Sequence, residues 1–132
     1  MPRRNAVLPL VAVAALGLVT GCEKQSPWVT MTADGVVVKA RATKYCREGG
    51  KCNESKDAPT LKVKSGGILG IDVPRSVAEQ GWRIGDQGEF RHDHYFALPI
   101  PADAPPGASQ QLQVVRDQKH GEGVWTFNIV VK

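Results

Sequence analysis

The sequence predicts an all-β domain, an immunoglobulin-like Greek-key sandwich of about seven or eight short antiparallel strands, preceded by a signal peptide. Three observations predict this class. Apolar and polar residues alternate with a period of two, turn residues separate the alternating runs at short intervals, and no apolar pattern of helical period runs through the domain. Because each run is apolar on one face only, we expect two antiparallel sheets with their apolar faces packed together.

The first element is an export segment, which we place at residues 1–21. Arg3 and Arg4 give it a positive start, and residues 6–19 carry no charge. As a helix, this run would span roughly 21 Å, which is shorter than the bilayer core of about 30 Å. It is therefore typical of a signal peptide and too short for a stable membrane-spanning anchor. The general secretory route and the twin-arginine route both remain open.

The export segment ends in Leu18-Val19-Thr20-Gly21-Cys22, a run of small residues before a cysteine that resembles a lipobox. We expect lipidation of Cys22, which then begins the mature chain; the alternative is an ordinary signal peptide with a chance cysteine. Two acyl chains on one cysteine suffice for stable membrane attachment. Residues 22–28 form a linker that reaches roughly 20 Å at most, so the domain at 29–132 should lie close to the membrane.

The strands of the domain are expected where alternation is clearest. They are residues 29–32, 36–42, 61–64, 69–73, 82–84, 92–98, 112–114 and 125–131. One helical turn is expected at 76–80, and the proline-rich residues 99–109 should form a loop. Trp82 and Trp125 are expected in the core, whereas Trp28 either packs under the first strand or rests at the membrane interface.

Cys46 and Cys52 remain as an even pair once Cys22 is lipidated. In an exported protein such a pair indicates a disulfide, and Gly49 and Gly50 provide the turn between them. Metal binding and redox activity are disfavoured, because the C-x5-C spacing matches neither a zinc knuckle nor a C-x-x-C motif. Closing so short a loop is worth roughly 2.4 kcal/mol.

His92 and His94 are the candidate metal ligands. On a strand, an H-x-H pair presents both imidazoles on one face, where zinc or copper could bind. Such a site needs a third ligand, for which His120 and Asp86 are candidates. The alternative is a solvated strand end beside a charged loop.

Charge and motifs disfavour several classes of function. The formal charge is +4, falling to about +2 without Arg3 and Arg4, and the basic residues are dispersed, so we expect no nucleic-acid partner. No G-x-S-x-G elbow, no spacing typical of a catalytic triad and no phosphate-binding loop occur. We therefore assign no catalytic residue and expect no cofactor.

Four stretches carry a family resemblance: the lipobox ending at Cys22, Ala42-Thr43-Lys44-Tyr45-Cys46, Ile68-Leu69-Gly70-Ile71-Asp72-Val73-Pro74 and Gly81-Trp82-Arg83-Ile84. On these, the chain resembles small actinobacterial envelope lipoproteins of unknown function. The resemblance implies a location in the cell envelope, and it implies no activity and no catalytic residues.

We therefore expect an exported lipoprotein, anchored to the cell membrane through Cys22 and facing the extracytoplasmic side. Its expected role is non-catalytic binding of an envelope protein or cell-wall component, with residues 86–93 and 99–109 as the first surfaces to test. One alternative is a metal- or small-ligand-binding lipoprotein that uses His92 and His94. The other is a cell-wall enzyme, which requires a cleft with two carboxylates or an activated nucleophile.

Overall fold

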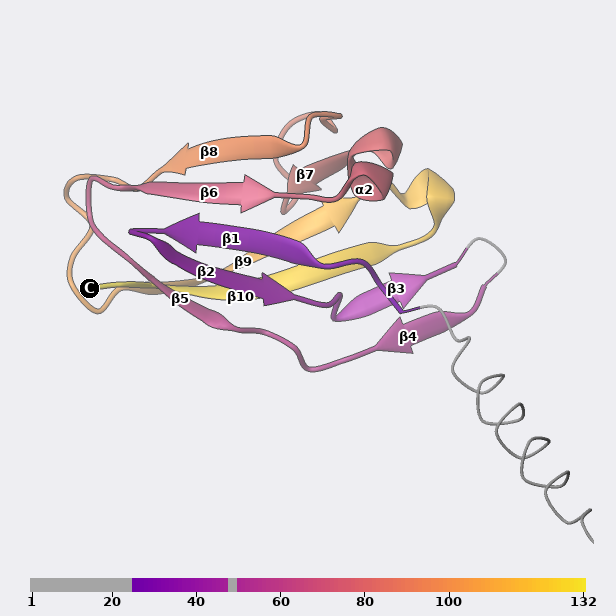
Figure 1. Cartoon of the computed structure of the whole chain (residues 1–132), viewed down its shortest axis with the longest axis horizontal. Coiled ribbons are helices and arrows are strands. Elements are labelled where there is room, and N and C mark those ends of the chain that lie inside the picture. Colours follow the sequence, from indigo (N-terminus) through magenta and orange to yellow (C-terminus); the bar gives the residue numbers. More distant parts are fainter. Residues whose placement is uncertain (1–24, 48–49) are drawn as a thin grey trace, which may run out of the picture.

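The computed structural model describes residues 25–47 and 50–132. The predictions for residues 1–21 and for Cys22 lie outside the described residues. Within them, the chain folds into two β-sheets packed face to face, so the predicted sandwich is confirmed (Figure 1). The described residues form ten strands, because a short hairpin at residues 44–54 adds to the strands expected from alternation.

The first sheet has four strands, all antiparallel. Their order is β2 (Val36–Ala40), β1 (Val29–Ala33), β6 (Ile68–Asp72) and β8 (Tyr95–Pro99). Asp34 and Gly35, both at positive φ, form the two-residue turn between β1 and β2, as hairpins of this length require. Val36 is exposed, because it lies beside this turn on the edge strand of the sheet.

The second sheet has six strands and is built around the long strand β10. Its path is β4 (Cys52–Glu54), β3 (Lys44–Cys46), β10 (Gly123–Val131), β9 (Ser109–Arg116) and β7 (Trp82–Ile84). The remaining strand, β5 (Thr60–Val63), lies beside the second half of β10 and pairs with it in parallel. The expectation of antiparallel strands throughout is corrected at this pair.

In the described part of the chain, two short helical segments connect strands. α2 (Arg75–Gln80) begins after Pro74 and confirms the expected helical turn, and η2 (Gln118–His120) lies between β9 and β10. Among the described residues, no helix is long and apolar enough to cross a membrane.

Side chains from both sheets fill the core. Trp82 and Trp125 are fully buried, as expected. Each indole N–H donates to a backbone carbonyl, from Trp82 to Asp93 at 2.8 Å and from Trp125 to Pro27 at 2.9 Å, so neither polar group is left without a partner. The apolar residues around them include Met31, Leu61, Leu69, Ile71, Val77, Val114, Phe127 and Ile129.

Candidate functional site

A cleft of about 810 Å³ opens between the edges of the two sheets. β8 of the four-stranded sheet borders one side, and β7 and β9 of the six-stranded sheet border the other. Residues 86–93 and 99–109, the segments that the sequence indicated as binding surfaces, both contribute to its wall. Its volume lies in the range of pockets that enclose ligands.

The inner wall of the cleft is apolar because it is the open side of the core. Phe96, Leu98 and Ile100 pack against the core but stay only partly buried, as do Ala104 and Ala108 in the proline-rich loop. The deeper wall consists of buried core residues, namely Val63, Leu69, Leu112, Ile129 and Val131. An apolar group in the cleft would complete the burial of the exposed atoms, which favours binding.

β9 lines the cleft in a different way from β8. Every residue from Ser109 to Gln113 borders it. Since side chains alternate along a strand, a strand that lines a cavity with successive residues presents its backbone edge to it. β7 pairs with β9 only at Val114–Arg116, and no other described strand pairs with this edge. Next to this pairing, the N–H of Gly85 donates to the carbonyl of Gln113. The edge of β9 from Ser109 to Leu112 is therefore open to a ligand.

The rim of the cleft carries charges of both signs, from Arg83, Asp86, Glu89 and Arg91. The guanidinium of Arg91 lies 3.8 Å from the ring centroid of Phe96, and that of Arg83 lies 4.4 Å from the ring centroid of Phe90. Each arginine thus stacks on an aromatic ring, a geometry that holds the planar group in place.

Arg83 keeps unused hydrogen-bonding capacity. Its Nη1 donates to the carbonyl oxygen of Gly88 at 3.0 Å, but its buried Nε has no acceptor. No carboxylate among the described residues forms an ion pair with it, whereas Nη1 of Arg91 lies 3.8 Å from Oδ2 of Asp93. Since a guanidinium has five N–H donors, Arg83 can still bind an acceptor supplied by a ligand.

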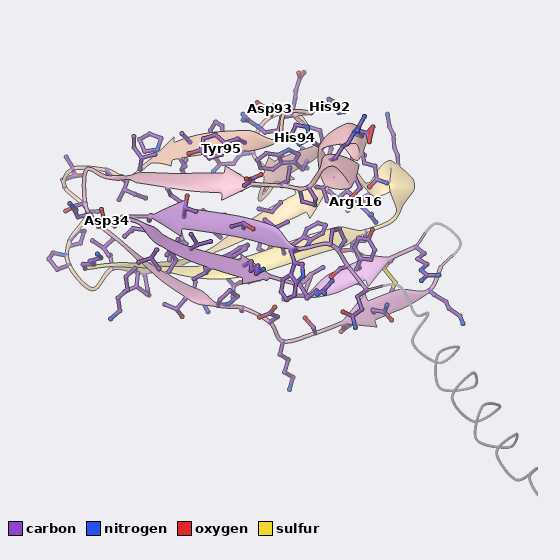
Figure 2. The ribbon with its side chains drawn as sticks, viewed as in Figure 1. Asp34, His92, Asp93, His94, Tyr95 and Arg116 are labelled. Atoms are coloured by element: carbon purple, nitrogen blue, oxygen red, sulfur yellow. A yellow bond between two sulfur atoms is a disulfide. The ribbon has the colours of Figure 1, made fainter. Side chains whose placement is uncertain are left out.

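The structure corrects the placement of His92 and His94. β8 begins at Tyr95, so both histidines precede the strand and do not share one of its faces (Figure 2). Nδ1 of His92 lies 3.2 Å from the carbonyl oxygen of Ala78, in α2.

The third metal ligand is also not found. No group of three or more histidine, cysteine or acidic side chains that could hold a metal ion occurs in the described part of the chain. Asp86 lies on the rim of the cleft, and the side chain of His120 is outside the described part.

The predicted disulfide is present between Cys46 and Cys52. These residues face each other across the paired strands β3 and β4, so the bridge closes the hairpin that the sequence did not predict. Neither strand has an apolar face of its own, which explains why the alternation of residues gave no signal there.

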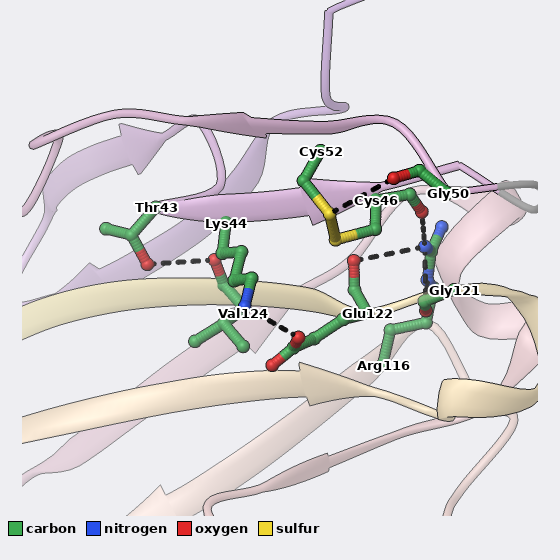
Figure 3. A network of polar contacts seen from close by, with 9 residues as sticks. All are labelled: Thr43, Lys44, Cys46, Gly50, Cys52, Arg116, Gly121, Glu122 and Val124. Atoms are coloured by element: carbon green, nitrogen blue, oxygen red, sulfur yellow. Dashed lines mark hydrogen bonds and ion pairs between the residues drawn. A yellow bond between two sulfur atoms is a disulfide. The ribbon is translucent and has the colours of Figure 1, made fainter.

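Sequence reasoning also missed Arg116, which is 2% exposed at the end of β9. Its Nη2 donates to the carbonyl oxygens of Cys46 at 3.0 Å and Gly121 at 2.9 Å (Figure 3). Its Nη1 donates to Oε1 of Gln80 at 3.1 Å. Its guanidinium also stacks on the ring of Tyr45, 4.4 Å from the centroid. One arginine therefore ties together β3, β9, α2 and the turn before β10.

The described end of the expected linker is part of the fold. Ser26 is buried and its Oγ accepts a hydrogen bond from the backbone N–H of Ala42 at 2.9 Å. Trp28 is 41% exposed and lies beneath the cations of Arg41 and Lys39, at 4.0 and 5.4 Å from its ring centroid. The expectation that Trp28 packs under the first strand is therefore wrong, because this ring lies at the surface beside two positive charges.

Searches of curated proteins and of solved structures found no match. A family model described as "Protein of unknown function (DUF2771)" matches residues 22–116, which include β1 to β9. Because the match covers most of the sequence, the chain belongs to the DUF2771 family.

Proposed function

We propose that this protein is an exported lipoprotein, anchored to the cell membrane through Cys22, and that it is a non-catalytic binding module of the cell envelope. The observation that carries the binding role is the cleft between β8 and β9, with its apolar inner wall and open strand edge. Its ligand is an envelope protein or a cell-wall component. The resemblance to small actinobacterial lipoproteins is consistent with this location.

Three observations support anchoring at Cys22. The family match begins at this residue, where we expect the mature chain to begin. Only Glu23 and Lys24 separate Cys22 from the first described residue, a reach of roughly 11 Å. The disulfide between Cys46 and Cys52 fits an oxidising compartment outside the cytoplasm.

The acidic residues of the cleft support binding more than catalysis. Asp86 and Glu89 line it, so a cell-wall enzyme would have two carboxylates available. Both side chains are exposed to solvent, however, whereas catalytic carboxyl groups act in sites from which water is excluded. The assignment of a binding role without catalysis rests on this difference.

The binding role is tested by photo-cross-linking in cells. A photoreactive amino acid replaces Gln87 or Ala104, which line the cleft, or Lys62, which is exposed on β5 outside it. Discrete cross-linked products are expected from both cleft positions and none from Lys62. The proposal is overturned if the cleft positions yield no product above the Lys62 control.

Anchoring is tested by the mass of the protein isolated from membranes. The amino terminus is expected at Cys22 with the added mass of lipid, and Cys22→Ser is expected to leave the protein unprocessed by the lipoprotein pathway. A wild-type protein that carries no lipid on this residue would contradict the proposal.

A further inference from the structure

We infer that the ligand of the cleft is an extended segment of another polypeptide, which adds to the six-stranded sheet as a further strand beside β9. This inference rests on the proposed binding function and names the chemistry of its ligand. Two hydrogen bonds define the direction in which the backbone groups of β9 point.

The first bond runs from the N–H of Val131 to the carbonyl of Ala108, and the second from the N–H of Gly85 to the carbonyl of Gln113, both at 2.8 Å. Even-numbered residues of β9 therefore direct their backbone groups toward β10, and odd-numbered residues direct theirs away from it. Ser109 and Gln111 consequently point their N–H and C=O groups along the open edge. Such unpaired groups are a template for a strand from another chain.

The cleft has the right shape for that strand. β7 ends at Ile84, opposite Val114, so an added strand would continue the line of β7 along Ser109–Leu112. Four residues of strand span roughly 13 Å. Every second side chain of the segment would face Phe96 and Leu98, which are partly buried on the opposite side of the cleft. The ligand should therefore alternate apolar and polar residues.

The charges at the rim argue against an anionic lipid as the ligand. Two arginines and two acids line the rim, so the cleft has no excess positive charge to hold a phosphate head group. A segment with charges of both signs complements such a rim, where its acidic side chains would pair with the arginines and its basic ones with Asp86 and Glu89. A lipid, in addition, would leave the open backbone groups of β9 without partners.

The position of the expected anchor excludes the amino-terminal residues of the mature chain as the source of the added strand. Ser26 is hydrogen-bonded to Ala42, just before β3. In the sheet, β3 lies on one side of β10, and β9 and β7 lie on the other. Residues 22–24 reach roughly 11 Å and cannot cross the sheet to the cleft. The added strand therefore comes from another molecule.

Gln111→Pro is the variant that tests strand addition. Proline removes the N–H that points into the cleft, while the bonds to β10 through Gln110 and Leu112 remain, and an edge position tolerates it. Val37→Pro is the matched control, since its N–H points to the free edge of β2, away from the cleft. Circular dichroism checks that both variants are folded.

The probes are a library of acetylated, amidated octapeptides that alternate Val, Ile, Leu or Phe with Thr, Lys or Glu, and the apolar dye 1-anilinonaphthalene-8-sulfonate. Fluorescently labelled peptides are expected to bind the wild type and Val37→Pro saturably, and at least tenfold more weakly to Gln111→Pro. Methylating alternate backbone nitrogens of the best peptide should abolish binding in one parity and preserve it in the other. Comparing the two methylated peptides tests strand addition even if Gln111→Pro does not fold.

Each contrary outcome has a distinct meaning. If the dye binds in the cleft and no peptide displaces it, strand addition is overturned and the binding function stands with a small apolar ligand. Equal effects of methylation in both parities would also overturn strand addition. Sedimentation could instead show a dimer that Gln111→Pro abolishes and Val37→Pro does not. The added strand would then come from a second copy of this chain and not from a different polypeptide. If neither dye nor peptide binds, the proposed function and the inference fail together.

Discussion

Replacing Arg116 with methionine should destabilise the domain more than replacing Arg83 with methionine or Asp34 with asparagine. The substitution leaves the carbonyl oxygens of Cys46 and Gly121 and the amide of Gln80 without a buried donor. Each such loss costs about 1–3 kcal/mol, and the apolar volume of methionine recovers part of it. We expect a net loss of about 3–5 kcal/mol, a large fraction of the stability of an ordinary domain.

The assay is urea unfolding of the mature chain, followed by the fluorescence of the buried Trp82 and Trp125. With a urea slope typical of a domain this size, the expected loss lowers the midpoint by roughly 2–4 M. Arg116→Lys should give an intermediate loss of about 2 kcal/mol, because it keeps the charge but not the planar fork that reaches several oxygens. A fall in midpoint below about 0.5 M for the methionine variant would refute the assigned role.

Arg83→Met is the matched control for this experiment. Arg83 also stacks on an aromatic ring, but it is only partly buried and donates one hydrogen bond, to Gly88. Its replacement should cost less than about 1 kcal/mol, and a cost equal to that of Arg116→Met would mean that loss of any stacked arginine explains the effect.

Three further predictions concern stability. Replacing both bridging cysteines with serine should lower the free energy of unfolding by about 2 kcal/mol, measured in urea without reductant, and no loss would contradict the bridge. The hydrogen bond from Lys132 lowers the pKa of Asp34 below its ordinary value, so Asp34 stabilises the fold above about pH 4 and loses this effect as the pH falls through the lowered pKa. Asp34→Asn should therefore reduce the difference between urea midpoints at pH 7 and about pH 2, and an unchanged difference would count against it. Gly121→Ala should cost about 3 kcal/mol or more in a thermal melt, because its Cβ would lie 2.2 Å from the carbonyl oxygen of Cys46 at a φ of +99°. Gly107→Ala, with positive φ but open space, should cost only about 1 kcal/mol, and equal costs would show that the clash is unimportant.

Local patterns predicted the parts of this fold that depend on local physics. Alternation located the strands that bury one face, such as β1 and β5, because burial on one side imposes a period of two. The β3–β4 hairpin escaped this test because a disulfide and pairing with β10 hold it, and its residues Lys44 and Glu54 show no apolar face. The parallel pairing of β5 with β10 joins distant parts of the sequence, and no local signal encodes it.

The candidate site could be predicted only in outline. Turn and proline content indicated two exposed loops, and both line the cleft, but the open edge of β9 depends on where β7 stops pairing. The H-x-H spacing gave the relative direction of two side chains on a strand and not the residue at which the strand begins. Arg116 did leave a signal: it follows Leu112 and Val114 on the inward face of β9, where a cation needs buried partners.

The sheet order also determines how the proposed anchor and the cleft relate. β3, which lies beside the first described residues, and β9 flank β10 on opposite sides, so lipid at Cys22 would hold the domain by the side away from the cleft. The bilayer then forms no part of the binding site. Cys22→Ser, expressed without the export segment and oxidised to form the disulfide, should therefore bind the same peptides with the same affinity as the lipidated protein. A loss of peptide binding in this folded, lipid-free variant would show that the membrane surface completes the site. That result would contradict the proposal that the cleft alone binds the added strand.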